Sequence, residues 1–318
     1  MRMPSLLRAG DRVAVIATSG PCDIERLACG VQVIKDMGLV PEVMESCYLR
    51  HGYLAGVDDV RLRDLHMAFA DPCVKGVFVA RGGYGAGRLL SMLDYDLIRY
   101  NPKVFVGYSD VTALHIAITQ RCGFITFHGP MPAADFGRGV EAFTLGSLKS
   151  MVFSPLGGAG AKLRQKDGPI EAVLKWNDYR SSLPINPPGR PLFTIVPGYA
   201  TGPLTGGNLS LLAASIGTPY ELDTRGRILF IEETGEDPYR IDRMLLQLKQ
   251  AGKLSDAGGI ILGDFGPQTL ESLHICINEL IVPEKKPTLA GLAFGHTSPN
   301  LTLPVGGIVE LDLLFHAS

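Results

Sequence analysis

The sequence predicts an α/β protein built from two domains, and three observations lead to that prediction. At 318 residues the chain is long for a single hydrophobic core. Short apolar runs alternate with longer amphipathic runs through residues 1–153, and a Gly- and Pro-rich stretch separates this part from a second alternating series. Strands joined by helical crossovers form parallel, doubly wound sheets. We therefore expect such a sheet in the first domain and a second α/β domain after it.

The first domain, residues 1–153, is expected to be flavodoxin-like. Its strands are predicted at residues 12–18, 76–81, 103–108 and 124–127. Its first helix begins after Asp23, which is a good N-cap, and ends before Gly38. Further helices are predicted at residues 58–70, 87–92 and 110–121. Sheets of this kind carry their functional loops at the carboxyl ends of the strands.

The second half of the chain divides into a connection and a further domain. Residues 154–202 hold no long periodic stretch, which indicates an inter-domain connection with a strand or two. In the second domain, residues 203–318, helices are predicted at 208–216, 239–250 and 270–280, and strands at 227–232, 258–263, 288–294 and 307–313. We expect the active site in the cleft between the two domains.

Composition and charge exclude several classes of protein. An apolar fraction of 46% is typical of a packed globular chain, and the net charge of −2 argues against a nucleic-acid partner. The N-terminus lacks a signal-peptide core, and no segment reaches the roughly 20 apolar residues of a membrane helix. The six cysteines form no CxxC pair, which favours reduced thiols in the cytoplasm. No cluster has metal-ligand spacing, so neither a metal nor another cofactor is expected.

The most informative stretch is KVFVGYSDVTALH at residues 103–115. An apolar strand runs into Ser109, and a helix begins at once, so the serine hydroxyl is pushed out of the sheet edge where it can attack. The backbone N–H of Asp110 then points toward a developing oxyanion. The alternative is that Ser109 or Asp110 only caps the helix. An α/β-hydrolase elbow requires Gly two residues after the serine, and this chain has Val111, so an elbow here belongs to another fold.

A serine nucleophile needs a base and usually an acid that orients the base. His128 and His296 both follow apolar strands, and the pattern does not separate them; the other five histidines are interpreted as structural. Glu232 is the last residue of the strand predicted at 227–232, and Glu233 follows it. Adjacent strand residues point to opposite faces, so at most one of these carboxylates faces the cleft.

The run RGGYGAGR at residues 81–88 follows another strand of the first domain. It resembles the start of a dinucleotide-binding fingerprint, but no acidic residue ends a following strand at the right distance. We interpret it as a glycine loop beside the elbow that supplies a second N–H group to an oxyanion hole.

Seven segments in order along the chain resemble the LD-carboxypeptidase family of serine peptidases, which also contains the microcin C self-immunity hydrolases. The segments are GDRVAVIATSG at 10–20, RGGYGAGRLL at 81–90, VFVGYSDVTALH at 104–115, HGP at 128–130, GGNLSLL at 206–212, LFIEETGEDPYRIDRMLLQL at 229–248 and GHTSPNLTLPVGG at 295–307. The resemblance covers nearly the whole chain. The chain departs from the family at Ala17-Thr18-Ser19, where the family often has Ala-Pro-Ser. This loop borders the expected site, so the resemblance predicts the chemistry but not the fine substrate preference.

The resemblance implies a Ser–Glu–His triad, with Ser109 as nucleophile, His296 as general base and Glu232 orienting the imidazole. It also implies an oxyanion hole formed by the N–H groups of Gly83 and Asp110. Members of the family release terminal D-alanine from peptidoglycan tetrapeptides by cleaving an L–D peptide bond. They do so in the cytoplasm, during cell-wall recycling, and are usually homodimers.

Two alternatives to a murein tetrapeptide carboxypeptidase stay open at this point. The first is a hydrolase of the same fold acting on peptidyl or acyl-sulfamoyl adenylates, as in the microcin C branch. The second is a non-catalytic two-domain binding protein. A peptide substrate with a terminal carboxylate also calls for a cation, for which Arg81, Arg88 and Arg240 are candidates.

Overall fold

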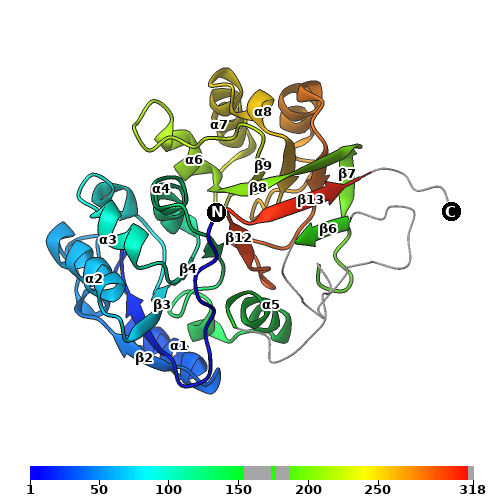
Figure 1. Cartoon of the computed structure of the whole chain (residues 1–318). Helices are drawn as coiled ribbons and strands as arrows, with labels where there is room; N and C mark the ends of the chain where they lie inside the picture. Colours follow the sequence, from blue (N-terminus) through cyan, green and yellow to red (C-terminus); the bar gives the residue numbers. More distant parts are fainter. Residues whose placement is uncertain (154–172, 177–185, 314–318) are drawn as a thin grey trace. The chain divides into compact units, whose positions relative to one another are not determined.

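The structure is a computed structural model that describes residues 1–153, 173–176 and 186–313 (Figure 1). The chain divides into two compact units. Unit 1 consists of Met1–Leu156 with Thr302–Pro304, and unit 2 consists of Gly157–Leu301 with Val305–Ser318. Both units combine a sheet with helices, which confirms the predicted fold class of two α/β domains.

Six described strands form the sheet of unit 1, in the order β12-β5-β4-β3-β1-β2. Their bounds are β1 Arg12–Ile16, β2 Val40–Val43, β3 Val74–Val79, β4 Val104–Gly107, β5 Thr126–His128 and β12 Leu303–Val305. Strands β1 to β5 pair in parallel, and their order is that of a flavodoxin-like sheet. Strand β4 is buried at every position, as expected of a strand covered on both faces.

Helices cover both faces of this sheet. Helices α1 and α5 lie on one face and α2, α3 and α4 on the other (Figure 1). The helices are α1 Ile24–Asp36, α2 Asp58–Ala70, α3 Tyr95–Tyr100, α4 Thr112–Cys122 and α5 Ala142–Val152, with short 3₁₀ turns η1 Glu45–Tyr48, η2 Ala86–Leu89, η3 Ser109–Val111 and η4 Phe136–Arg138. Asp23 caps α1 as predicted, accepting hydrogen bonds from the N–H groups of Glu25 and Arg26. The helix predicted at residues 87–92 is only the turn η2.

The sheet of unit 2 contains seven described strands in the order β6-β13-β8-β9-β10-β11-β7. They are β6 Val173–Trp176, β7 Phe193–Val196, β8 Tyr199–Asn208, β9 Ile228–Glu232, β10 Gly259–Leu262, β11 Thr288–Ala290 and β13 Ile308–Asp312. The central strands β8 to β11 are parallel; β7 pairs antiparallel with β11, β13 pairs antiparallel with β8, and β6 pairs antiparallel with β13. Unit 2 therefore has a mixed sheet with a parallel centre.

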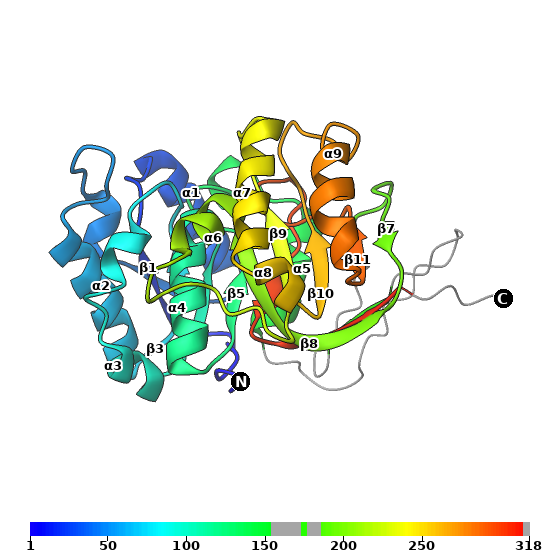
Figure 2. The same ribbon diagram turned by 90° about the horizontal axis from the view of Figure 1, so that it is seen from above.

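The described helices of unit 2 gather on one face of this sheet (Figure 2). They are α6 Leu209–Ser215, α7 Pro238–Gln250, α8 Lys253–Asp256 and α9 His274–Cys276, followed by the π-turn η5 Ile277–Ile281 and the 3₁₀ turn η6 Val282–Glu284. No helix in the described ranges is long and apolar enough to cross a membrane.

Three elements of unit 2 differ from the sequence prediction. Strand β8 runs for ten residues across position 203, where the predicted connection with its strand or two was expected to end. No strand was predicted at these particular residues, because their glycines and Pro203 disfavour strands in isolation. The strand predicted at 288–294 ends at Ala290, since Gly291 turns the chain with φ of 94°. The helix predicted at 270–280 begins only at His274.

Candidate active site

The turn predicted at Ser109 is present in unit 1. Strand β4 ends at Gly107, and Ser109 opens the turn η3 that leads into α4. The φ angle of Ser109 is 64°. Among the described non-glycine residues, only Ser109 and Lys285 have a positive φ. This left-handed conformation costs a serine about 1 kcal/mol or more, and strain of this kind concentrates at functional sites.

The glycine loop lies directly against this serine. A Cβ placed on Gly82 would come within 2.8 Å of both Cβ and Oγ of Ser109 and within 3.6 Å of the backbone nitrogen of Asp110. Only glycine fits at that distance. The loop is held from its other side as well, because the N–H of Gly20 donates to the carbonyl of Gly82 at 3.1 Å. The predicted position of the glycine loop beside the elbow is confirmed.

The carboxylate of Asp110 ties the elbow to the end of the glycine loop. It is buried and accepts a hydrogen bond from the N–H of Ala86 at 2.7 Å. Burial raises the pKa of this carboxyl, against hydrogen bonds from Ser19 and Ala86 that lower it. The fully buried Arg61 donates to the carbonyl of Gly85 at 2.9 Å, which gives the same loop a second hydrogen bond.

In unit 2, the side chains of Glu232 and His296 meet. Glu232 ends β9 and is 0% exposed, whereas the imidazole of His296 is 21% exposed. Oε2 of Glu232 lies 2.7 Å from Nδ1 of His296 and also accepts from the backbone N–H of His296 at 3.3 Å. An ionised carboxylate only accepts hydrogen bonds, so this contact favours the tautomer with the proton on Nδ1 and a basic lone pair on Nε2.

The neighbouring Glu233 has a different environment. Its carboxylate accepts hydrogen bonds from the N–H and hydroxyl of Ser210 at 2.8 and 2.7 Å, and from Asn208 at 3.2 Å. It therefore stabilises the beginning of α6. The two adjacent carboxylates point to different surroundings, as the strand geometry requires, and only Glu232 contacts a histidine in the described contacts.

The remaining predicted site residues lie as follows. His128 is fully buried at the end of β5, with its ring 5.7 Å from that of Tyr108. Arg81 donates to the carbonyls of Gly82 at 3.2 Å and Pro21 at 3.1 Å. Two further arginines form ion pairs at the surface. Arg88 pairs with both carboxylate oxygens of Asp58, and Arg240 pairs with Glu236 at 3.2 Å.

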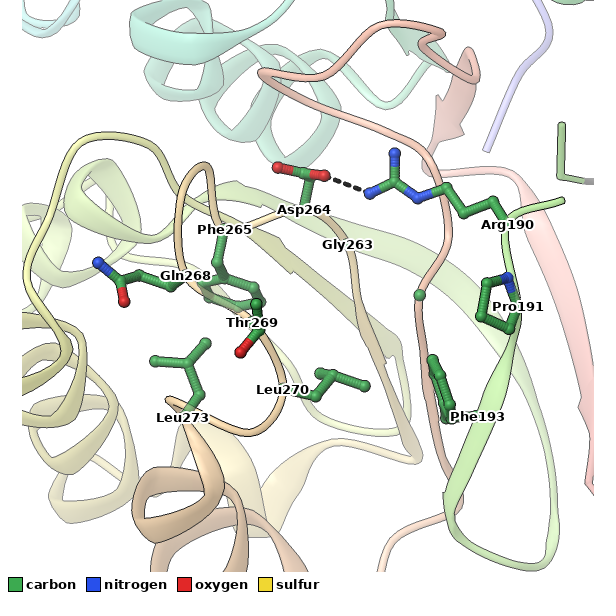
Figure 3. Close-up of a pocket in the computed structure, with 11 residues that line it drawn as sticks. Arg190, Pro191, Phe193, Gly263, Asp264, Phe265, Gln268, Thr269, Leu270 and Leu273 are labelled. Atoms are coloured by element: carbon green, nitrogen blue, oxygen red, sulfur yellow. Dashed lines mark hydrogen bonds and ion pairs between the residues drawn. The ribbon is translucent and has the colours of Figure 1, made fainter.

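A cavity of ≈ 170 Å³ opens in unit 2 between β10, β11 and the segment before β7 (Figure 3). At one end Arg190 forms an ion pair with Asp264, and Phe193, Leu270 and Leu273 lie at the other. Sequence analysis missed Arg190, because it lies in the Gly- and Pro-rich stretch where no periodic pattern marks it.

No group of three or more His, Cys, Asp or Glu side chains in the described part of the chain is placed to hold a metal ion. All six cysteines lie in that part, and none is in a disulfide.

Comparison with known proteins gives two family matches and several similar chains. The description "LD-carboxypeptidase N-terminal domain" matches residues 13–129, and "LD-carboxypeptidase C-terminal domain" matches residues 201–311. A protein of Bacillus subtilis named "Probable murein peptide carboxypeptidase" is 42% identical over 316 residues, which cover 97% of this chain and 91% of that protein.

Two solved structures resemble the fold of the whole chain. The muramoyltetrapeptide carboxypeptidase from Oxalobacter formigenes has a TM-score of 0.74 and 31% identity, over 95% of this chain and 98% of that one. An MccF-like protein from Bacillus anthracis has a TM-score of 0.83 and 28% identity, over 99% of this chain and 100% of that one.

Proposed function

This chain belongs to the LD-carboxypeptidase family of peptidases, and from that premise we propose that it is a serine-type carboxypeptidase that releases terminal D-alanine from murein tetrapeptides. The substrate class is supported by the names of the relatives from Bacillus subtilis and Oxalobacter formigenes. The serine type is supported by the conformation of Ser109, whose positive φ and close glycine loop are those of a nucleophile elbow.

The observation that carries this proposal is the contact of 2.7 Å between Glu232 and His296. A buried carboxylate that orients a partly exposed imidazole is two-thirds of a catalytic triad. We assign Ser109 as the nucleophile, His296 as its general base and Glu232 as the residue that fixes the tautomer of the base. His128 is fully buried at the end of β5, whereas the imidazole of His296 is 21% exposed and can reach a substrate.

The reaction follows from these roles. The Oγ of Ser109 attacks the carbonyl carbon of the L–D peptide bond while Nε2 of His296 takes the hydroxyl proton. The N–H groups of Gly83 and Asp110 stabilise the oxyanion, and one such donor typically contributes about 10²–10³ in rate. His296 then protonates the departing amine of D-alanine. A water molecule, deprotonated by the same imidazole, hydrolyses the acyl-enzyme and regenerates Ser109.

The terminal carboxylate of the substrate requires a cation, for which we propose Arg81 or Arg240. Arg240 carries the greater weight, because its side chain is 46% exposed and its contacts with Glu236 and the hydroxyl of Tyr239 lie at the surface, where a substrate carboxylate can replace them. The guanidinium of Arg81 already donates to two backbone carbonyls of unit 1.

We also propose that the protein acts in the cytoplasm, as a homodimer and on a soluble peptide. The six cysteines without disulfides agree with a reducing compartment. The dimer follows from the family resemblance and is tested by light scattering of the purified chain.

The test is incubation with two tetrapeptides that differ only in the configuration of the terminal alanine. We expect free D-alanine from the L–D peptide and no alanine from the peptide ending in L-alanine. Release of L-alanine at a similar rate would contradict the assigned specificity.

The similarity to the MccF-like protein favours one second candidate, a hydrolase of the microcin C branch, for which the sequence resemblance implies peptidyl or acyl-sulfamoyl adenylates as substrates. An aminoacyl-sulfamoyl adenosine added to the same assay separates the two. Cleavage of this compound with a higher kcat/KM than the tetrapeptide would place the chain in that branch.

A further inference from the structure

The loop that carries His296, residues 291–297, is held by a second segment of unit 2 that lies far from it in sequence. This segment precedes β7, which pairs antiparallel with β11 so that Phe193 lies opposite Ala290. The carbonyl of Pro191 would lie 2.5 Å from a Cβ on Gly291, so the two backbones stay in close contact where the loop begins.

Asn186 holds the first half of the loop. Its side-chain amide donates to the carbonyl of Gly291 at 3.1 Å and accepts from the N–H of Ala293 at 2.9 Å. The same amide donates to the carbonyl of Arg190 at 2.9 Å. Asn186 is only 5% exposed, so these hydrogen bonds lie away from solvent, where leaving a partner unsatisfied is costly.

Arg190 holds the second half of the loop, next to the imidazole. Its Nη1 donates to Oγ1 of Thr297 at 2.8 Å, and Thr297 directly follows His296. Its Nη2 pairs with the carboxylate of Asp264 (Figure 3). The rigid fork of a guanidinium can hold two such partners at once, whereas the single ammonium group of a lysine lacks that geometry.

Asp264 connects Arg190 to the end of β9, where Glu232 lies. Its other oxygen accepts from the N–H of Gly266 at 2.8 Å, and its carbonyl accepts from the N–H of Glu233 at 3.0 Å. Glu233 follows Glu232 in the chain. These contacts form a closed ring. It runs along the chain from Glu232 to Glu233, then by hydrogen bonds to Asp264, Arg190 and Thr297. Thr297 is bonded to His296, and the hydrogen bond from His296 to Glu232 closes the ring.

We propose that Asn186 and Arg190 are positioning residues for His296. They fix the backbone of the histidine loop, so that the imidazole keeps the orientation set by Glu232 throughout the reaction. The inference rests on the proposed function, since it requires His296 to be the base. A catalytic group displaced by about 1 Å can lose on the order of 10²-fold in rate, which is the scale of the expected effect.

Thr297→Val and Arg190→Lys test the proposal at the two ends of one hydrogen bond. Valine keeps the shape of Thr297 and removes the acceptor, whereas Thr297→Ser keeps the hydroxyl and serves as the conservative rescue. Arg225→Lys is the matched control, since Arg225 forms an exposed ion pair with Asp223 in the same unit. Melting temperatures of all variants are measured beside kcat and KM for D-alanine release.

We expect Thr297→Val and Arg190→Lys each to lower kcat about tenfold to 100-fold, with KM changed less than about threefold and Thr297→Ser close to the wild type. The double variant should be no slower than the slower single variant, because both changes break the same contact. A kcat within twofold of wild type for Thr297→Val, or losses that multiply in the double variant, would overturn the proposal.

The rate at which a fluorophosphonate labels Ser109 is measured on the same variants. This reaction needs the base but no particular peptide. If the wild type is labelled yet releases no D-alanine, the assigned substrate is wrong, and the labelling rates of the variants still decide whether Arg190 and Thr297 position His296.

Discussion

The surroundings of Ser109 in unit 1 and of His296 in unit 2 are built by different physical means. Ser109 is placed by backbone geometry: a strained φ of 64° and a glycine loop so close that a single methyl group would touch the hydroxyl. His296 is placed by polar side chains, namely Glu232 directly and Asn186 and Arg190 through its loop. One half of the proposed site depends on the absence of side chains and the other on their presence.

This difference determines which substitutions the surroundings of Ser109 and of His296 tolerate. Steric contact below van der Waals distance rises steeply in energy, so an added atom in unit 1 displaces the serine or its loop. A single hydrogen bond contributes a modest free energy, and several hydrogen bonds hold His296 and its loop in unit 2. Removing one of them should therefore lower kcat only partly. The two regions are therefore expected to respond differently to equally small substitutions.

The largest expected effect is loss of the proposed nucleophile in unit 1. Ser109→Ala and Ser109→Gly should each lower kcat by about 10⁴-fold or more. Because glycine accepts a positive φ without strain, Ser109→Gly should be more stable than Ser109→Ala by about 1 kcal/mol. Chemical denaturation of the two variants measures this difference. Equal stability would show that the turn stores no strain at this residue.

Next in size is the effect of Glu232→Gln in unit 2. The amide of Gln donates toward Nδ1, which favours the tautomer with its proton on Nε2, and that tautomer cannot accept the serine proton. A loss of about 10⁴-fold in kcat with KM little changed is expected, as for the corresponding Asp→Asn change in a Ser-His-Asp triad. A variant whose KM rises while kcat stays within tenfold of wild type would place Glu232 in substrate binding instead.

A smaller loss is expected from Gly82→Ala in unit 1. The added Cβ would lie 2.8 Å from Oγ of Ser109, so the serine or the loop must move, and kcat should fall about 10²–10³-fold. Gly87→Ala is the matched control in the same loop, since a Cβ there meets nothing within 4 Å. The steric account of unit 1 fails if the two alanine variants have similar kcat.

The smallest expected effect is on stability alone. His115 in α4 is fully buried, and burial lowers its pKa from 6.5 to about 4. Its unfolded form therefore binds a proton that its folded form does not. Burying the neutral imidazole therefore costs the folded state no free energy of unfolding above pH 6.5. As the pH falls from 6.5 toward 4, the free energy of unfolding decreases by up to about 3 kcal/mol.

Substitution of His115 gives the measurement. Denaturant unfolding of wild type and His115→Gln between pH 7 and pH 4 should show a shallower pH dependence for the variant. Parallel curves would mean that another group carries the acid sensitivity of unit 1.

The same contrast explains what the sequence could predict. The elbow and the glycine loop are local patterns, so residues 103–115 and 81–88 sufficed to predict the turn and its neighbour. Strand alternation predicted that only one of Glu232 and Glu233 faces the site, and the family resemblance selected Glu232; the contacts of Glu232 with His296 and of Glu233 with Ser210 agree with that choice. Between His128 and His296 the pattern gave no preference, and only the family resemblance separated them.

Arg190 and Asn186 could not be predicted in this way. Their contacts join positions about a hundred residues apart, and they lie in a stretch whose prolines and glycines indicate a connection. The position of strand β8 was not predicted for a related reason: its pairing with β9 and β13 outweighs the poor strand propensity of its glycines. Tertiary contacts, which no local pattern records, decide both cases.

The central claim is that Ser109 is a nucleophile activated by His296. The most direct measurement is labelling with a fluorophosphonate, followed by peptide mass spectrometry, on the wild type, His296→Ala and His128→Ala. We predict a single adduct on Ser109 that forms at a similar rate in the wild type and His128→Ala, and at least about 10²-fold more slowly in His296→Ala. An adduct on another residue, or normal labelling in His296→Ala with loss in His128→Ala, would contradict the account.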